Sequence, residues 1–74
     1  MLKYNMISLD AIYKHSSGVR YKTIRFTLNA TNYEKTNRVN KMILYKQLED
    51  GKYPKGTIWV RSLKSFLKNF SLEK

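Results

Sequence analysis

Apolar and polar residues alternate in four short runs that are rich in β-branched and aromatic side chains. These runs are residues 11–15, 19–28, 38–48 and 57–61. Alternation with a period of two places one set of side chains on each face of an extended chain, so each run predicts a strand. Clusters of Ser, Asn, Gly and Asp separate the runs and predict turns. The turn segments are residues 16–18, 29–37 and 50–56.

The longest run changes the phase of its alternation. Val19 and Tyr21 occupy one face of the expected strand, whereas the apolar residues of 24–28 occupy the other. A β-bulge or a sharp coil of the strand near Thr23 would turn all of them toward the core. We therefore expect a strongly bent strand, as small barrels need.

The run at 38–48 is apolar on both faces. Met42, Leu44 and Leu48 share one face, while Ile43 and Tyr45 share the other. This pattern indicates either a central strand or an additional apolar interface on the second face.

Both ends of the chain add an element. The apolar residues of the tail are Leu63, Phe66, Leu67 and Phe70. Their spacing has a helical period, and Ser62 stands where an N-cap is needed, so we expect an amphipathic helix over about residues 62–71. Residues 1–9 alternate like a strand, which could add an edge to the sheet or pair with a second copy in a homodimer.

Together these elements predict one domain over residues 1–74 that is mainly β. The expected architecture is an SH3-like curled sheet or barrel of about 4–5 strands with a short C-terminal amphipathic helix. The OB-fold is the neighbouring alternative, for which 74 residues make a short chain.

The charge balance narrows the class of partner. Fifteen Lys and Arg residues oppose five Asp and Glu residues, giving a formal net charge of +10. A field of this sign attracts polyanions and speeds their encounter. Nucleic acid is the expected partner, an acidic protein surface is the alternative, and a solvated lysine-rich surface without a charge-related role is the third interpretation. A signal peptide and an apolar run of about 20 residues are both missing, so we expect a cytoplasmic protein without a membrane span.

Residue types that support catalysis or metal binding are scarce. The chain has no cysteine and one histidine, His15, so neither a disulfide nor a structural zinc site is expected. The five acids are scattered and suggest no acid–base pair. We therefore expect a binding protein that is not an enzyme and that needs no metal and no cofactor.

Basic residues near aromatic ones supply a candidate nucleic-acid surface. Trp59 and Arg61 lie two apart on one strand and so share a face. If Ile58 and Val60 face the core, the pair faces outward and could stack a base and bind a phosphate. In the alternative interpretation, Trp59 packs under the helix and Arg61 covers it. The candidate nucleic-acid-binding residues are Arg20, Lys22, Arg38, Lys46, Trp59 and Arg61.

The order of several short motifs resembles a known family. The motifs are Tyr13-Lys14-His15-Ser16-Ser17-Gly18, Tyr21, Ile43-Leu44-Tyr45-Lys46-Gln47-Leu48 and Trp59-Val60-Arg61 followed by Phe66. Over residues 11–67 they resemble the family called domain of unknown function 1653, although Ser62 stands where that family usually has proline. The resemblance implies a compact β domain from a bacterium or phage and no established activity. It also implies that one shared feature, such as a pocket, contains Tyr13, His15, Tyr21, Tyr45, Trp59 and Arg61.

Three functional hypotheses follow. The first is a nucleic-acid-binding module that uses a cationic sheet face. The second is a phage or mobile-element module that binds a host protein through Ile43, Tyr45 and the N-terminal strand. The third is a small-ligand pocket around His15, Trp59 and Arg61.

Overall fold

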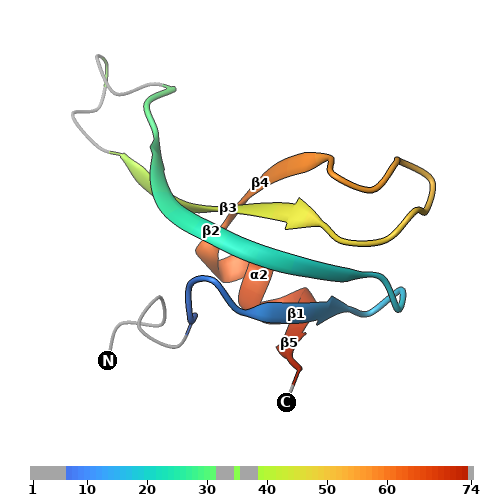
Figure 1. The fold of residues 1–74 in the computed structure, drawn as a ribbon. Coiled ribbons are helices and arrows are strands. Elements are labelled where there is room, and N and C mark those ends of the chain that lie inside the picture. The colour runs from blue at the N-terminus through green and yellow to red at the C-terminus, as the bar shows by residue number, and fades with distance from the viewer. Residues whose placement is uncertain (1–6, 32–34, 36–38, 74) are drawn as a thin grey trace.

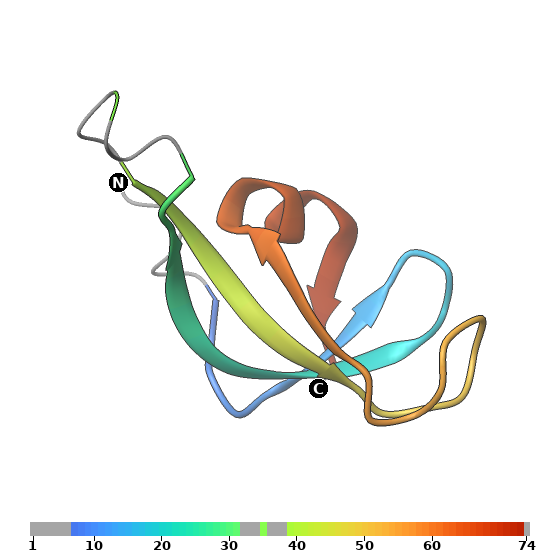
Figure 2. The ribbon, with the colours of Figure 1, turned by 90° about the horizontal axis from the view of Figure 1, so that it is seen from above.

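The computed structural model describes residues 7–31, 35 and 39–73. In chain order the elements are β1 (Ile12–His15), β2 (Arg20–Asn29), β3 (Asn40–Gln47), β4 (Ile58–Ser62), α2 (Leu63–Asn69) and β5 (Phe70–Leu72). The strands form one antiparallel sheet in the order β4-β3-β2-β1-β5. The sheet curls so that α2 lies inside the curve (Figures 1 and 2). This confirms the predicted fold class, a mainly β curled sheet with one short helix near the C-terminus.

The two faces of the sheet differ in composition, and cross-strand pairing defines them. One row across β2, β3 and β4 is Thr23, Tyr45 and Trp59. This row faces α2, and we call its side the concave face. The adjacent row across β1 to β4 is Ile12, Lys22, Lys46 and Ile58. It points away from α2, on what we call the convex face.

The predicted bulge in the second strand is confirmed. The register between β2 and β3 shifts between Thr23 and Arg25. The shift places Phe26 opposite Ile43 and therefore on the concave side. The expectation that the apolar residues of 24–28 all join the core was wrong, because Ile24, Phe26 and Leu28 stay 38%, 38% and 58% exposed. The end of β2 and the start of β3, at the left of the view, extend beyond α2 (Figure 1).

The C-terminal helix is shorter than expected. The Ser62 side chain accepts a hydrogen bond from the Ser65 backbone N–H at 3.2 Å, which confirms the predicted N-cap. The helix ends at Asn69 rather than near residue 71, and the chain continues as β5 beside β1, with Phe70 opposite His15. Phe70 thus belongs to two elements, because it continues the apolar face of the helix and is the first residue of β5.

The core is largely aromatic and lies between the concave face and α2. Its buried apolar members are Ile7, Tyr13, Ile43, Tyr45, Leu63, Phe66 and Phe70. Ile43 and Tyr45 are 0% and 3% exposed, so β3 is a central strand and these two residues cannot form the partner interface of the second hypothesis. Of the expected N-terminal strand 1–9, residues 1–6 lie outside the described residues. Residues 7–9 are not in a strand, and Ile7 belongs to the chain's own core.

Candidate binding site on the concave face

Strand β4 turns its tryptophan and arginine toward the inside of the curve. Ile58 and Val60 are 50% and 53% exposed on the convex face. Trp59 and Arg61 are therefore on the concave face, where both are half-buried. From the sequence, Trp59 and Arg61 would face outward if Ile58 and Val60 were in the core, and the exposure of Ile58 and Val60 contradicts that condition. Trp59 and Arg61 lie on the opposite face from Lys22 and Lys46. Core packing of Trp59 is the closer interpretation, although Arg61 lies over Phe70 rather than over the indole.

Below Arg61 the aromatic rings form a continuous cluster, which we call the ring cluster. It consists of His15, Tyr21, Tyr45, Phe66 and Phe70. The Phe66 and Phe70 rings stack with centroids 4.1 Å apart, and the other contacts are edge-on, at centroid distances from 4.8 to 6.4 Å. Edge-to-face pairs add to the stabilisation from area burial alone, and they hold each ring in a defined orientation.

Arg61 is fixed on this cluster by hydrogen bonds to neutral groups. Its Nε donates to the Tyr45 hydroxyl at 3.1 Å, and its Nη1 donates to the Ser65 hydroxyl at 3.0 Å. The guanidinium carbon lies 5.2 Å from the centre of the Phe70 ring. Within the described residues, no carboxylate pairs with Arg61. The site therefore holds a partly desolvated, oriented cation that has no counter-ion among those residues, which is the arrangement that an anionic ligand complements.

His15 stands at the edge of the cluster as a neutral imidazole. Its Nδ1 accepts a hydrogen bond from the Ser17 backbone N–H at 3.0 Å and lies 2.9 Å from the Ser17 hydroxyl oxygen. Burial, with a smaller effect of the Arg61 charge, lowers the pKa of His15 below 6.5. Burial also raises the pKa of Tyr21, and Tyr45 adds to that shift while Arg61 opposes it. His15 and Tyr21 are thus uncharged near neutral pH.

Trp59 is oriented by a buried glutamine. Gln47 is 3% exposed, and its Oε1 accepts a hydrogen bond from the indole Nε1 at 3.0 Å. Its Nε2 donates to the carbonyls of Glu49 and Tyr53 at 2.9 and 2.6 Å. One side chain therefore fixes both the indole and the loop at 48–57. That loop presents Tyr53, 49% exposed, edge-on to Trp59 at a centroid distance of 5.0 Å.

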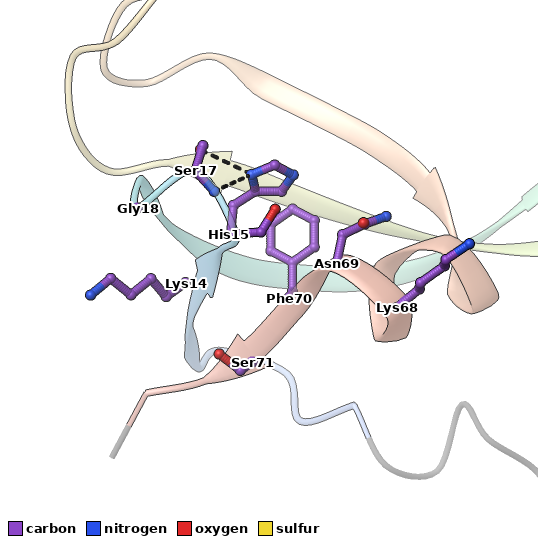
Figure 3. A pocket seen from close by; sticks show the side chains of 9 residues that line it. Lys14, His15, Ser17, Gly18, Lys68, Asn69, Phe70 and Ser71 are labelled. Atoms are coloured by element: carbon purple, nitrogen blue, oxygen red, sulfur yellow. Dashed lines mark hydrogen bonds between the residues drawn. The ribbon is translucent and has the colours of Figure 1, made fainter.

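A shallow hollow of about 470 Å³ adjoins His15, between the β1–β2 turn and the junction of α2 with β5 (Figure 3). Its lining is polar apart from Phe70, and His15 and residues 16–18 form the rim on the side of the turn. Lys14 and Lys68 both line it, but their side chains extend away from each other (Figure 3). The hollow is open and has room for a small polar molecule.

Of the other predicted cations, Arg20, Lys22 and Lys46 lie on the convex face. Arg20 donates three hydrogen bonds to the Glu49 carboxylate, two from its guanidinium and one from its backbone N–H, and these lower the pKa of Glu49. Its Nη1 also lies 3.7 Å from Glu73 Oε1. Lys22 pairs with Asp10 at 3.1 Å and stands opposite Lys46 in the register. Arg38 lies outside the described residues. The cationic sheet face expected from the sequence thus carries Arg20, Lys22 and Lys46, of which the first two are paired with carboxylates.

The structure gathers most of the pocket residues that the family resemblance suggests. His15, Tyr21, Tyr45 and Arg61 meet in or on the ring cluster. Tyr13 contacts Phe66 from below, at a centroid distance of 5.0 Å, and Trp59 points toward Gln47. Sequence reasoning missed Phe70 and Gln47 as site residues. The helical spacing of Phe70 concealed its role in the site. Gln47 lies two residues after Tyr45 on the same strand and so shares its buried face, and this spacing could have indicated that Gln47 belongs to the site.

No protein-family model, curated protein or solved structure matches this chain. Membership of the family of unknown function therefore stays a prediction. None of the helices in the described residues has the length and apolar character that crossing a bilayer requires. Within the same residues, no three His, Asp or Glu side chains come together as metal ligands would.

Proposed function

We propose that this protein is a non-catalytic nucleic-acid-binding module whose contact surface is the partly exposed edge of the concave face at Trp59 and Arg61. The observation that carries the proposal is Arg61, an oriented cation without a carboxylate partner in the described residues, on the same face as Trp59. Single-stranded nucleic acid is the form of ligand that fits, because its bases can leave the stack and lie on aromatic rings. Tyr53, with half of its surface exposed, offers such a ring beside Trp59.

Cations surround this aromatic surface. Lys52 and Lys55 flank Tyr53 in the loop at 48–57, and both are exposed. Lys64 and Lys68 are exposed on α2, which follows β4 directly in the chain. The described acids nearest in sequence on either side are Asp50 and Glu73. The Asp50 carboxylate accepts a hydrogen bond from the Lys55 backbone N–H, and Glu73 lies 3.7 Å from Arg20. A backbone path from Tyr53 past Arg61 to Lys68 would therefore meet positive charge along its length.

Fluorescence anisotropy with a labelled oligonucleotide tests the proposal. We expect Tyr53→Ala to weaken binding by about 1–3 kcal/mol, the cost of losing one stacked base, and Tyr53→Phe to retain affinity because the ring remains. Trp59 is the one tryptophan of the chain, so its emission should change on binding. No measurable binding at low salt would exclude this function.

A matched pair of charge variants locates the surface. Lys52→Ala and Lys46→Ala each remove one positive charge, the first beside Tyr53 and the second on the convex face. We expect Lys52→Ala to reduce the salt dependence of binding by about 0.7 in slope on a single strand, and Lys46→Ala to leave it unchanged. The reverse result would place the contact on the convex face, as the sequence hypothesis had it.

The hollow beside His15 favours a second candidate, a small polar ligand. Its lining offers hydroxyls from the β1–β2 turn and one imidazole. A thermal-shift screen with nucleoside phosphates tests this function. A rise in melting temperature that is lost in Ser17→Ala would support it, and a flat response would exclude it.

A further inference from the structure

We propose that the free edge of β4 and the apolar surface beside it bind an extended, acidic segment of a partner protein by strand addition. This site lies on the outer edge and convex face of the sheet, and it is independent of the concave surface proposed for nucleic acid. Its occupant would extend the sheet by one strand next to Ile58–Ser62.

The first observation is an unprotected edge. β4 is the last strand in the order β4-β3-β2-β1-β5 and pairs with β3 alone in the described part of the chain. Natural sheets usually protect such edges with Lys, Pro, a bulge, an inward-pointing charge or a covering segment. The sequence of β4, Ile-Trp-Val-Arg-Ser, contains no Lys or Pro, and β4 pairs with β3 without a bulge. Its inward charge, Arg61, is held by the Tyr45 and Ser65 hydroxyls, which leaves the convex side of the edge apolar. Its outward backbone groups are therefore open to a further strand.

The second observation is the apolar surface that continues from this edge. Ile58 and Val60 are 50% and 53% exposed on the convex face, and Val60 pairs with Leu44 of β3. A hollow of about 430 Å³ follows, lined by Met42, Leu44 and Val60 together with residues 27–30. An added strand would direct alternate side chains onto Ile58 and Val60, and a bulky residue beside it could enter the hollow.

Charge decides the kind of partner. The convex rows that end at this edge carry Lys46, opposite Ile58, and Arg25, opposite Leu44, while β3 and β4 contain no carboxylate. The chain as a whole has a net charge of +10. A second copy on this edge would bring the same cations and the same net charge against them, so self-association is opposed. An acidic segment is attracted to the charges that would repel a second copy. Its apolar residues would cover Ile58 and Val60, and its carboxylates would meet the surrounding cations.

Peptide binding tests the proposal directly. The probe is a synthetic peptide with alternating valine and threonine at its centre and a pair of glutamates at each end, measured by fluorescence anisotropy. Methylating the backbone nitrogens of either the valines or the threonines blocks one edge of the peptide strand. We expect one of these two methylated peptides to lose binding and the other to retain it, because only one edge pairs with β4. Equal binding of both would overturn strand addition.

Val60→Lys separates apolar docking from charge attraction. It adds a positive charge, so purely electrostatic binding would tighten. We expect about tenfold weaker peptide binding instead, since burying one valine-sized side chain is worth about that factor. The matched control is Leu72→Lys, because Leu72 is 42% exposed on β5 at the opposite edge of the sheet. Its affinity for the peptide should stay within about twofold of that of the parent protein.

The remaining outcomes are also decisive. Both lysine variants should keep the Trp59 emission of the folded parent protein, and if Val60→Lys does not, Ile58→Lys and the methylated peptides carry the test. Oligonucleotide affinity should not fall in Val60→Lys. Sedimentation of the parent protein as a dimer that Val60→Lys converts to a monomer would make a second copy the occupant and overturn the proposal.

Discussion

The buried amide of Gln47 makes a quantitative prediction, because one side chain holds three hydrogen bonds at the edge of the candidate site. Gln47→Leu keeps the approximate volume and removes all three, from the Glu49 carbonyl, the Tyr53 carbonyl and the Trp59 indole. At about 1 kcal/mol net per hydrogen bond, the sum is about 3 kcal/mol. Tyr53 is half exposed, so water can replace its bond. We therefore expect a loss of about 2–3 kcal/mol in the free energy of unfolding.

Gln47→Glu adds a pH dependence whose sign follows from the same geometry. The carboxylate would keep an acceptor for Trp59 but would face two carbonyl oxygens with no proton to donate. Burial and these oxygens disfavour the charged form, so the pKa of the new carboxyl rises above its ordinary value of about 4.3. The stabilisation by the protonated form is complete below that ordinary value and is lost as the pH rises through the raised pKa.

Urea unfolding followed by Trp59 fluorescence measures both effects, because the chain has one tryptophan. Gln47→Leu should be destabilised at every pH. The free energy of unfolding of Gln47→Glu should approach that of the parent protein near pH 4 and become smaller than it toward about pH 8. Lys46→Ala, on the adjacent exposed residue, is the control and should change little. A loss below about 0.5 kcal/mol in Gln47→Leu, or a pH-independent Gln47→Glu, would refute the role assigned to this amide.

Three further predictions concern the fold that supports the site. The lowered pKa of His15 means that its contribution to stability is present above pH 6.5 and is lost as the pH falls toward the folded-state value. His15→Asn keeps an acceptor for the Ser17 N–H and should flatten this dependence in urea titrations kept above about pH 5, where carboxylates stay charged. The Thr23 hydroxyl, buried at 1% exposure, donates to the Ser8 carbonyl at 2.6 Å, so Thr23→Val should cost about 1–2 kcal/mol in thermal unfolding. Phe66 is fully buried and contacts Tyr13 and Tyr45, so Phe66→Ala should lower the free energy of unfolding by about 3–5 kcal/mol. A native-like melting curve for that variant would contradict the assigned core.

The fold was predictable wherever local pattern and tertiary packing agree. The four strands, the turn at residues 16–18, the bulge near Thr23 and the Ser62 cap each follow from alternation, turn residues or capping chemistry. β5 was not predictable, because three residues give no period and Phe70 also continues the helical spacing. Its strand conformation comes from β1, whose outer edge it covers. Local sequence does not record such a long-range pairing.

Most residues of the site could be predicted from the sequence, but the face of the sheet on which they lie could not. Period two shows that Trp59 and Arg61 share one face and that Ile58 and Val60 share the other, but it does not show which face is the core. On β4 the usual inference fails, since the aliphatic pair is outside and the cation is inside. Arg61 is accepted there because the Tyr45 and Ser65 hydroxyls and the Phe70 ring satisfy it. Those partners come from β3, α2 and β5, so they could be named only once the elements were assembled.

The sheet order also explains how excess charge becomes directional. Three of the four described acids come from distant parts of the chain, Asp10 before β1, Glu49 after β3 and Glu73 after β5. All three pair with cations of β2, namely Arg20 and Lys22. That part of the convex face is therefore nearly neutral. β3, β4, α2 and the loop at 48–57 carry seven cations, Lys41, Lys46, Lys52, Lys55, Arg61, Lys64 and Lys68, against two acids, Glu49 and Asp50. Because ions screen exposed charges within about 10 Å at 0.1 M salt, the direction of this field matters most at close approach, where it distinguishes one side of the molecule from the other.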